Sequence, residues 1–217
     1  MQADDFANPG MLWVTRGEKL WDEPRGAAAR SCASCHQDAG KSMRGVAASY
    51  PRVDPGSGHL LNLEGRINSC VRTGQRAEPL AYESEDLLAL TAYVAYQSRG
   101  TPLKVAIDGP ARSHFEAGRA LYYRRIGQMN LACTHCHEAN WGKHLAAETL
   151  SQGHPNAFPT YRLEWQTLGS LHRRLRACFN GVRAEPFAAG SPEFVGLELF
   201  LAWRAQGLAV ETPGVRR

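Results

Sequence analysis

The chain has 217 residues, of which 43% are hydrophobic and 21% are charged, and its formal net charge is +4 at pH 7. No segment approaches the ~18 consecutive apolar residues of a membrane span, so we expect a soluble protein with no such span. The length suits two small domains of about a hundred residues each, and domains of that size bury little apolar surface unless something is added to their cores.

The first predicted element is a helix over residues 11–23. Its apolar and small residues recur with helical spacing on one face, and residues 112–125 repeat the pattern one hundred and one positions later. The two sets are Val14, Gly17, Leu20 and Trp21, and Phe115, Gly118, Leu121 and Tyr122. Glycine inside a helix costs about 1 kcal/mol relative to alanine, so its recurrence predicts a close helix crossing, although chance glycines in a glycine-rich chain would also explain it.

Each predicted helix is followed by the sequence Cys-x-x-Cys-His. The residues are Cys32, Cys35 and His36 in the first copy and Cys133, Cys136 and His137 in the second. At this spacing two thiols add across the vinyl groups of one haem, while the histidine binds the iron from the proximal side. A single copy could instead be a zinc or redox site, but two copies in matching contexts favour haem attachment. The sequence therefore predicts two covalently bound haem c groups.

Haem attachment of this kind takes place in bacteria on the exported side of the membrane, so we expect a periplasmic protein. Residues 1–5 lack the basic and apolar segments of a signal peptide, and we expect that such a peptide has already been removed. Because the propionates of two haems would offset the formal charge of +4, we infer no binding to nucleic acid.

Polar loops that contain glycine and proline follow both motifs, over residues 37–58 and 138–159. Aligned backwards from two further cysteines, Cys70 and Cys178, the second loop has seven extra residues. These lie around Trp141, His144 and His154. We expect the two halves of the chain to differ most in structure at this insertion.

Each half ends in a predicted helix. Ser84 is a candidate N-cap for a helix over residues 87–99, and Ser191 is one for a helix that ends near residue 207. Small c-type cytochromes close over haem by packing such a last helix across the first one, and here the order of elements fits twice.

The predicted fold is therefore all-α, with two tandem cytochrome c-type domains related by internal duplication. The first would span residues 1–105 and hold haem 1, and the second would span residues 106–217 and hold haem 2. Residues 100–111 would form the linker between them.

The ligand opposite each histidine decides what the haems can do. Methionine is usual in electron carriers, but residues 138–217 contain none, and Met43 follows His36 too closely to reach the other haem face comfortably. Cys70 and Cys178 remain at equivalent places, and each lies on the apolar face of a predicted helix. We therefore predict that the iron ligand pairs are His36 with Cys70 and His137 with Cys178.

Other interpretations of these two cysteines stay open. They could form a structural disulfide in an oxidising compartment, or be inert buried thiols. Three histidines, which have no counterpart in the first half, could bind the second iron instead: His144, His154 and His172.

An arginine precedes each of these cysteines by four residues, Arg66 before Cys70 and Arg174 before Cys178. On a helix this spacing puts both side chains on one face, so a cation would lie beside the sulfur, favour thiolate over thiol and be able to hold an oxyanion. Arg173 and Arg176 could do the same near Cys178. In a chain with many arginines the spacing could also be accidental.

Together with the Arg-Ala-Glu-Pro sequences at residues 76–79 and 183–186, these motifs resemble the dihaem form of the SoxA family. SoxA is the larger subunit of the SoxAX cytochrome complex of bacterial sulfur oxidation. The resemblance implies an L-cysteine S-thiosulfotransferase that joins thiosulfate oxidatively to a cysteine of a SoxYZ-type carrier protein, while electrons leave through haem. It also implies a small SoxX-type cytochrome partner, His/Cys ligation of both haems, and a persulfide at Cys178.

We predict from these indications that Cys178 is the reactive sulfur, with Arg174 as its electrostatic partner, and that Cys70 is a spectator ligand. Two functions of other classes stay open. One is a plain periplasmic electron-transfer protein in which no substrate binds. The other is a thiosulfate dehydrogenase that couples two thiosulfates to tetrathionate without a carrier.

Overall fold

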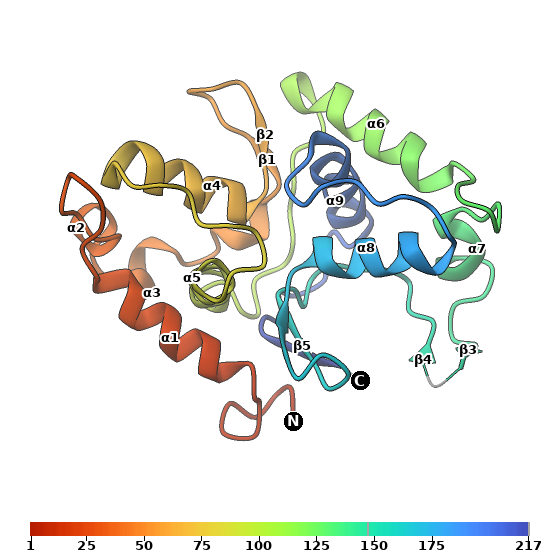
Figure 1. The fold of residues 1–217 in the computed structure, drawn as a ribbon, viewed down its shortest axis with the longest axis horizontal. Coiled ribbons are helices and arrows are strands. Elements are labelled where there is room, and N and C mark those ends of the chain that lie inside the picture. Colours follow the sequence, from red (N-terminus) through yellow and green to blue (C-terminus); the bar gives the residue numbers. More distant parts are fainter. Residues whose placement is uncertain (147, 217) are drawn as a thin grey trace.

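The computed structural model describes residues 1–146 and 148–216 as an elongated molecule with a group of helices at each end (Figure 1). In chain order the helices are α1 (Met11–Asp22), α2 (Ala33–His36), α3 (Ala39–Ser42), α4 (Leu63–Cys70), α5 (Glu85–Tyr96), α6 (Arg112–Tyr123), α7 (Cys133–His137), α8 (Leu171–Gly181) and α9 (Pro192–Arg204), with shorter 3₁₀ or π turns at Ala47–Ser49, Val71–Gln75 and Gly109–Ala111. None of the helices within the described residues has the length and apolar content to cross a membrane.

The first group of helices is organised by the crossing of α1 over α5. The apolar face predicted for α1 is buried, and Gly17 on that face lies directly against the backbone carbonyl of Ala89 in α5. Helix α5 begins where the sequence predicts, because the hydroxyl of Ser84 accepts a hydrogen bond from the amide of Leu87. The predicted close crossing at a glycine is therefore confirmed for this pair.

Helices α6 and α9 cross in the same manner in the second group. Gly118 of α6 lies against the carbonyl of Gly196 in α9, and Ser191 caps the start of α9 with Pro192 in its first turn. Aromatic rings fill the space beside the crossing, with the centroids of Tyr122 and Phe200 5.1 Å apart. This contact leaves no room for a side chain at residue 118.

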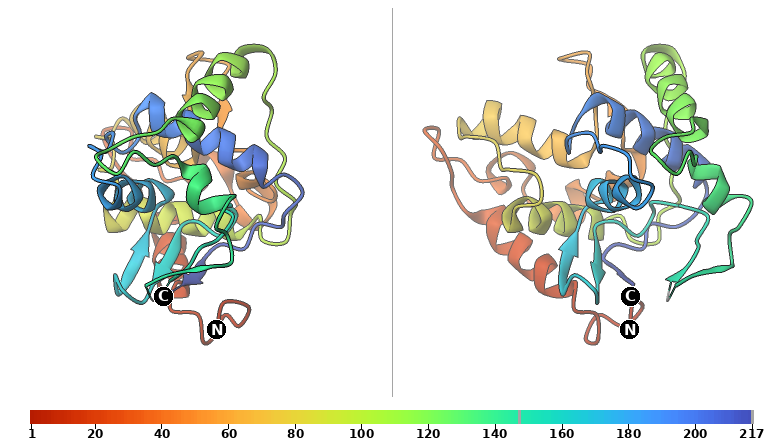
Figure 2. Two further views of the ribbon diagram at one scale, coloured as in Figure 1. Left: turned by 90° about the vertical axis from the view of Figure 1, so that its right-hand side faces the viewer. Right: turned by 45° about the vertical axis from the view of Figure 1, so that its right-hand side comes forward.

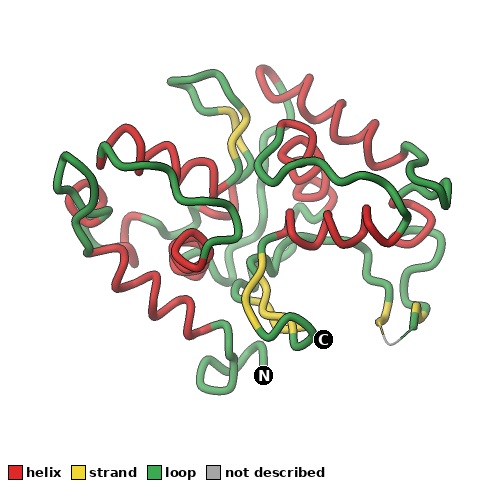
Figure 3. Tube along the Cα trace, viewed as in Figure 1, coloured by secondary structure: helices red, strands yellow, loops and turns green. Residues whose placement is uncertain are grey.

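Short strands accompany the helices, so the predicted all-α class is wrong. The strands are β1 (Arg52–Val53), β2 (Leu60–Leu61), β3 (His144–Leu145), β4 (Glu148–Thr149), β5 (Thr160–Arg162), β6 (Thr167–Gly169) and β7 (Gly214–Arg216). They form the antiparallel pairs β1–β2 and β3–β4 and a sheet of order β6-β5-β7, in which β7 runs parallel to β5 (Figure 3). Strands of two or three residues are too short to leave a period of two in the sequence.

The same sheet corrects the prediction of tandem domains related by internal duplication. Residues 1–105, all of which the structure describes, contain the antiparallel β1–β2 hairpin, which lies as far before Cys70 as β5–β6 lies before Cys178, but no third strand that corresponds to β7. The sheet packs below α8 beside α1 and brings the two chain termini close together (Figure 2). There Gln2 accepts a hydrogen bond from the amide of Val215 at 3.1 Å. The second half is thus not a plain copy of the first.

Apolar packing is continuous between the two groups of helices. Leu60 of β2 belongs to the core formed mainly by α6, α8 and α9, and Leu168 of β6 packs with Val14 and Leu88 of the first group. The segment after α5 also pairs with the chain after α9, since the amide of Leu103 donates to the carbonyl of Leu208. These contacts hold the two ends of the molecule in one arrangement.

We predict that Gly118→Ala lowers the free energy of unfolding by about 2 kcal/mol or more, because the added methyl group would overlap the Gly196 carbonyl and force α6 away from α9. The matched control is Gly181→Ala at the end of α8, where a methyl group would meet no atom within 4 Å. That variant should keep or raise stability by up to about 1 kcal/mol. Equal effects in denaturant unfolding would show that the glycine crossing is not a tight contact.

Candidate functional site

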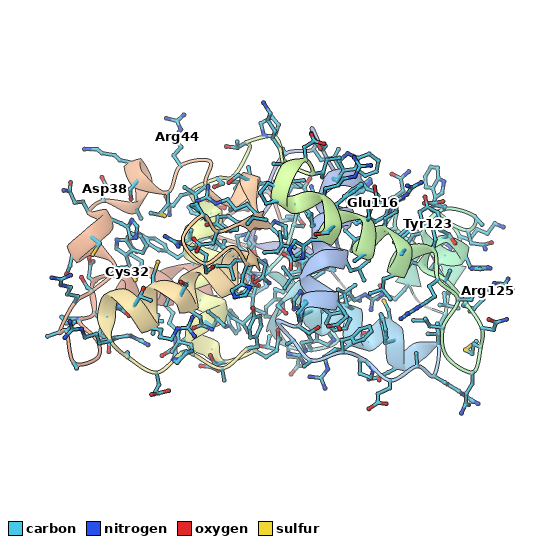
Figure 4. All side chains as sticks on the ribbon, turned by 90° about the horizontal axis from the view of Figure 1, so that it is seen from above. Cys32, Asp38, Arg44, Glu116, Tyr123 and Arg125 are labelled. Atoms are coloured by element: carbon cyan, nitrogen blue, oxygen red, sulfur yellow. The ribbon has the colours of Figure 1, made fainter. Side chains whose placement is uncertain are left out.

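The two Cys-x-x-Cys-His sequences form single helical turns, α2 and α7, at opposite ends of the molecule. Figure 4 shows Cys32 towards one end, and Tyr123 and Arg125, which precede α7, towards the other. In α7 the ring of His135, one of the two residues between the cysteines, accepts a hydrogen bond from the Ala132 amide at 3.0 Å and lies 2.9 Å from Arg125. These contacts fix the turn that carries Cys133, Cys136 and His137.

At the first site Cys70 ends α4 and lies close to the Cys32 turn. Burial, and then the proximity of Cys70, raise the pKa of Cys32 to about 11. Leu63 and Ile67, on the face of α4 that leads to Cys70, pack with Trp21 of α1, and the centroid of the Trp21 ring lies 5.8 Å from that of His36. The structure therefore brings the four predicted residues Cys32, Cys35, His36 and Cys70 to one place.

Arg66 at this first site is already neutralised. Its guanidinium donates a hydrogen bond to the carboxylate of Asp54 at 3.0 Å and forms an ion pair with it. Burial raises the pKa of Cys70, and Arg66 opposes that rise only in part. The cation predicted from the spacing is present, but its charge is shared with Asp54.

At the second site the inserted loop holds the histidine. Nδ1 of His137 lies 2.7 Å from the carbonyl oxygen of Ser151, and burial lowers the pKa of His137, so the imidazole is neutral. Nδ1 therefore donates its proton to that carbonyl, which leaves Nε2 free to bind a metal. Gly153, in the left-handed region at φ +75°, packs against the same ring. The prediction that the halves differ most at this loop agrees with the β3–β4 hairpin within it.

Cys178 lies on α8 one turn beyond Arg174, facing the Cys133 and Cys136 side of the site. Burial raises the pKa of Cys178, and the charges of Arg174 and then Arg162 oppose the rise. Among the residues that the structure describes, no carboxylate lies within ion-pair distance of Arg174, in contrast to Arg66. The second site thus combines a partly buried sulfur with a cation whose charge is not neutralised locally.

Two further arginines at this site, one buried and one partly exposed, were missed by the sequence analysis. The side chain of Arg162 in β5 is only 5% exposed and pairs with Glu148 at 3.1 Å and Glu164 at 2.7 Å. Arg204 of α9 donates to the carbonyl of Gln152 at 2.8 Å and lies 4.7 Å from the centre of the Tyr122 ring. Arg162 ties the inserted loop to β5 through Glu148, and Arg204 ties it to α9 through Gln152. No local pattern marks these two contacts, because Glu148 and Gln152 are distant from the arginines in sequence.

Most of the alternative assignments receive little support. All six cysteines are free, so Cys70 and Cys178 form no disulfide. His172 is buried away from the site, with Nδ1 accepting a hydrogen bond from the Gly190 amide at 2.9 Å and Nε2 lying 3.0 Å from Glu198. His144 is exposed on β3. Burial lowers the pKa of His154, and the charges of Arg204 and His137 lower it further, so His154 lies near His137 and stays an alternative to Cys178 as its partner ligand.

The residues present fit a haem at both ends. Each site offers two thiols for thioether bonds and an imidazole whose pKa is lowered by burial, and the Cys32 and Cys133 side chains pack against apolar clusters. A thiol from a second helix completes the donor set at each end. This combination suits a planar, largely apolar group with axial ligands better than a bare ion.

Comparisons with known proteins agree with this geometry. The model of the SoxA/TsdA cytochrome c domain matches residues 16–103. The chain is 46% identical over 217 residues to the L-cysteine S-thiosulfotransferase subunit SoxA of Pseudaminobacter salicylatoxidans, covering all of this chain and 76% of that protein. It is 42% identical over 216 residues to the same subunit of Paracoccus pantotrophus, covering all of this chain and 74% of that protein.

Among solved structures, the crystal structure of SoxXA from P. pantotrophus contains a chain that superposes with a TM-score of 0.96 at 42% sequence identity. The match covers all of this chain and 81% of that one. The similarity therefore extends over the second half, beyond the residues that the family model matches.

We predict that Gly153→Ala disturbs the second site through His137. An added methyl group would lie 3.2 Å from the imidazole ring, and residue 153 already has a positive φ. Gly142→Ala is the matched control, because Gly142 also has a positive φ, of +81°, but a methyl group there would meet nothing within 4 Å. Electron paramagnetic resonance of the oxidised protein should show one altered iron signal in the first variant and none in the second. Identical spectra for both variants would contradict the contact.

Proposed function

This chain belongs to the family of SoxA subunits of L-cysteine S-thiosulfotransferases, and from this premise we infer that it is the cytochrome c subunit that conjugates thiosulfate to a cysteine of a carrier protein. The family match, at 46% and 42% identity over essentially the whole chain, supports the reaction class. We infer the location of the reaction from the side chains around the two cysteines of this chain.

The observation that carries the assignment is the difference between the two arginines. Thiosulfate has two negative charges, and bringing it to a partly desolvated sulfur requires a cation that is free to pair with it. Arg66 beside Cys70 is paired with Asp54 at 3.0 Å, whereas Arg174 beside Cys178 has no such partner among the described residues. We therefore assign the reactive sulfur to Cys178, the anion-binding cation to Arg174, and a spectator role to Cys70.

Covalent haem c is expected from the cytochrome c domain that the chain contains. We propose two haems. Cys32 and Cys35 would attach one, with His36 and Cys70 binding its iron, and Cys133 and Cys136 would attach the other, with His137 and Cys178 binding its iron. The residue ranges 1–105 and 106–217 would each hold one. When bound, the haem supplies a one-electron acceptor beside the reactive sulfur, and a thiolate ligand lowers its potential.

The overall reaction forms one sulfur–sulfur bond between thiosulfate and the thiol of the carrier cysteine. It releases the thiol proton and two electrons, which leave one at a time. In this chain Arg174 would hold the sulfonate end of thiosulfate, while the outer sulfur of a Cys178 persulfide would bond to the other sulfur of thiosulfate as the two electrons leave. The carrier thiol would then attack that thiosulfate sulfur, lose its proton, break the new bond to the persulfide and so regenerate the Cys178 persulfide. Ser151 and Gly153 would keep the His137 ring in one orientation throughout.

We propose a small SoxX-type cytochrome and a SoxYZ-type sulfur carrier as partners, in the periplasm. The P. pantotrophus structure that resembles this chain is titled SoxXA, which supports the first partner. The carrier is required by the chemistry, because the thiol that accepts thiosulfate must be able to enter and leave the site.

The first test of this proposal is the number of haems. A pyridine haemochrome assay on the purified protein should give two haems per chain, because both Cys-x-x-Cys-His turns have the same donor set. Replacing Cys133 and Cys136 together by alanine should leave one haem. A value of one for the unaltered protein would contradict the proposed ligation.

The second test compares the two sites directly. With the cytochrome partner and the carrier present, Arg174→Ala should lower kcat/KM for thiosulfate conjugation roughly 10- to 100-fold, since a charge-assisted contact is worth about 1.5–3 kcal/mol. Arg66→Ala is the matched control and should have a small effect. Cys178→Met should retain haem but abolish conjugation, whereas Cys70→Met should do less, and peptide mapping should find extra sulfur on Cys178.

The products of the same assay separate this function from the alternatives. Thiosulfate bound to the carrier supports the transferase. Tetrathionate formed without the carrier would indicate a thiosulfate dehydrogenase, and no turnover would leave an electron-transfer protein. Normal conjugation by the Cys178→Met protein would place the reactive sulfur elsewhere.

A further inference from the structure

The helices that carry the two cysteine ligands begin at a common polar cluster in the middle of the molecule. Helices α4 and α8 extend from the centre in opposite directions (Figure 1). Glu64 lies in the first turn of α4 and His172 in the first turn of α8, each six residues before the cysteine of its helix. At about 1.5 Å of rise per residue, the cluster lies roughly 9 Å along each helix from the cysteine.

Glu198 of α9 is the carboxyl group that the other side chains of this cluster contact. Its Oε2 accepts a hydrogen bond from the side-chain amide of Asn62 at 3.1 Å and lies 3.0 Å from Nε2 of His172. Nδ1 of His172 accepts from the Gly190 amide, so the ring proton is on Nε2 and faces Glu198. The contact with Glu198 raises the pKa of His172 against the effect of burial, but a second proton on Nδ1 would break the Gly190 bond.

Glu64 is the member of the cluster whose carboxyl group can gain and lose a proton near neutral pH. It is 7% exposed, and its carboxyl group has no hydrogen-bond partner among the side chains that the structure describes. Burial, and then the charges of Glu198 and Glu83, raise the pKa of Glu64 against the opposing effect of His172, to about 7 in total. Tyr82, which stacks on His172 at 6.0 Å, stays neutral. Around neutral pH this carboxyl group therefore gains or loses its proton in response to small changes in nearby charge.

A cavity lies beside the carboxyl group of Glu64. It has a volume of about 60 Å³ and lies between the two groups of helices, lined by Glu64, Glu198 and Thr91 as well as by apolar side chains. The hydroxyl of Thr91, which is 2% exposed, has no partner and lines the same cavity. A water needs about 10–15 Å³ of such volume and two or more polar partners, so a few waters fit here.

We propose that the Glu64–Glu198 pair is a proton-binding site that takes up one proton when an electron enters the chain and releases it when the electron leaves. The inference rests on the proposed function, which puts an electron acceptor at the far end of α4 and of α8. The electron comes from the oxidation of thiosulfate and thiol, and the proton comes from solvent through the cavity. At the central cluster itself, the only bond that forms and breaks is the O–H bond of Glu64.

The physical reason is charge compensation. An electron adds one negative charge about two helical turns from the cluster, and no Lys or Arg side chain faces Glu64 among the residues that the structure describes to balance it. In a poorly solvated interior such a charge favours the protonated carboxyl group. Reduction at either end would therefore raise proton affinity at the same central site, which would couple the two ends electrostatically.

Spectroelectrochemical titration of the haem-loaded protein from about pH 6 to about pH 8.5 tests this inference, without thiosulfate or partner proteins. The midpoint potential of at least one haem should fall as pH rises through 7 in the unaltered protein and should be independent of pH in Glu64→Gln. Glu78→Gln, at an exposed carboxyl group of the same half, should behave like the unaltered protein. A pH dependence that survives in Glu64→Gln, or none in the unaltered protein, would overturn the proposal.

A second measurement keeps the inference testable if Glu64→Gln does not load haem. Reduced-minus-oxidised infrared spectra of the unaltered protein should show a protonated carboxyl band that gains intensity on reduction and shifts in D₂O, and its absence would overturn the proposal. Failure here with normal conjugation in the carrier assay would remove the proton site alone. Failed conjugation with a normal Glu64 response would remove the proposed function alone.

Discussion

Close contact between helix backbones at two glycines is the constraint on which the rest of this structure depends. Gly17 of α1 lies against α5, and Gly118 of α6 lies against α9, so each first helix packs directly on a closing helix with no side chain between them at the crossing. The Cys-x-x-Cys-His turns follow these first helices along the chain, so the crossings decide where the thiols and histidines stand. Helices α4 and α8, which carry Cys70 and Cys178, are then fixed in position opposite these two Cys-x-x-Cys-His turns.

Much of this arrangement could be predicted because its signals are local. Glycine spacing marked α1 and α6, serine caps marked α5 and α9, and the cysteine spacing marked α2 and α7. The sheet could not be predicted, because β7 joins β5 in parallel from a segment more than fifty residues away. Its strands of three residues are stabilised by that pairing and not by their own sequence.

The site shows the same division between local and distant information. The four-residue spacing correctly placed Arg66 and Arg174 on the cysteine helices, but the spacing is identical at both, so it could not distinguish them. The difference comes from Asp54, which reaches Arg66 from the loop between β1 and β2. Arg162 and Arg204 were missed for the related reason that the loop residues they contact, Glu148 and Gln152, are distant from them along the chain. Pairing, and not spacing, distinguishes the two arginines, and the proposed roles of the two sites depend on that difference.

The central claim is that thiosulfate is held at Cys178 by Arg174 and not at the equivalent place beside Cys70. Crystals of the haem-loaded protein soaked in thiosulfate, with anomalous maps for iron and sulfur, test it most directly. The account predicts iron between His137 and the Cys178 sulfur, with the anion in contact with the Arg174 guanidinium. An anion seated at Arg66, or an iron bound opposite His137 by a residue other than Cys178, would contradict it.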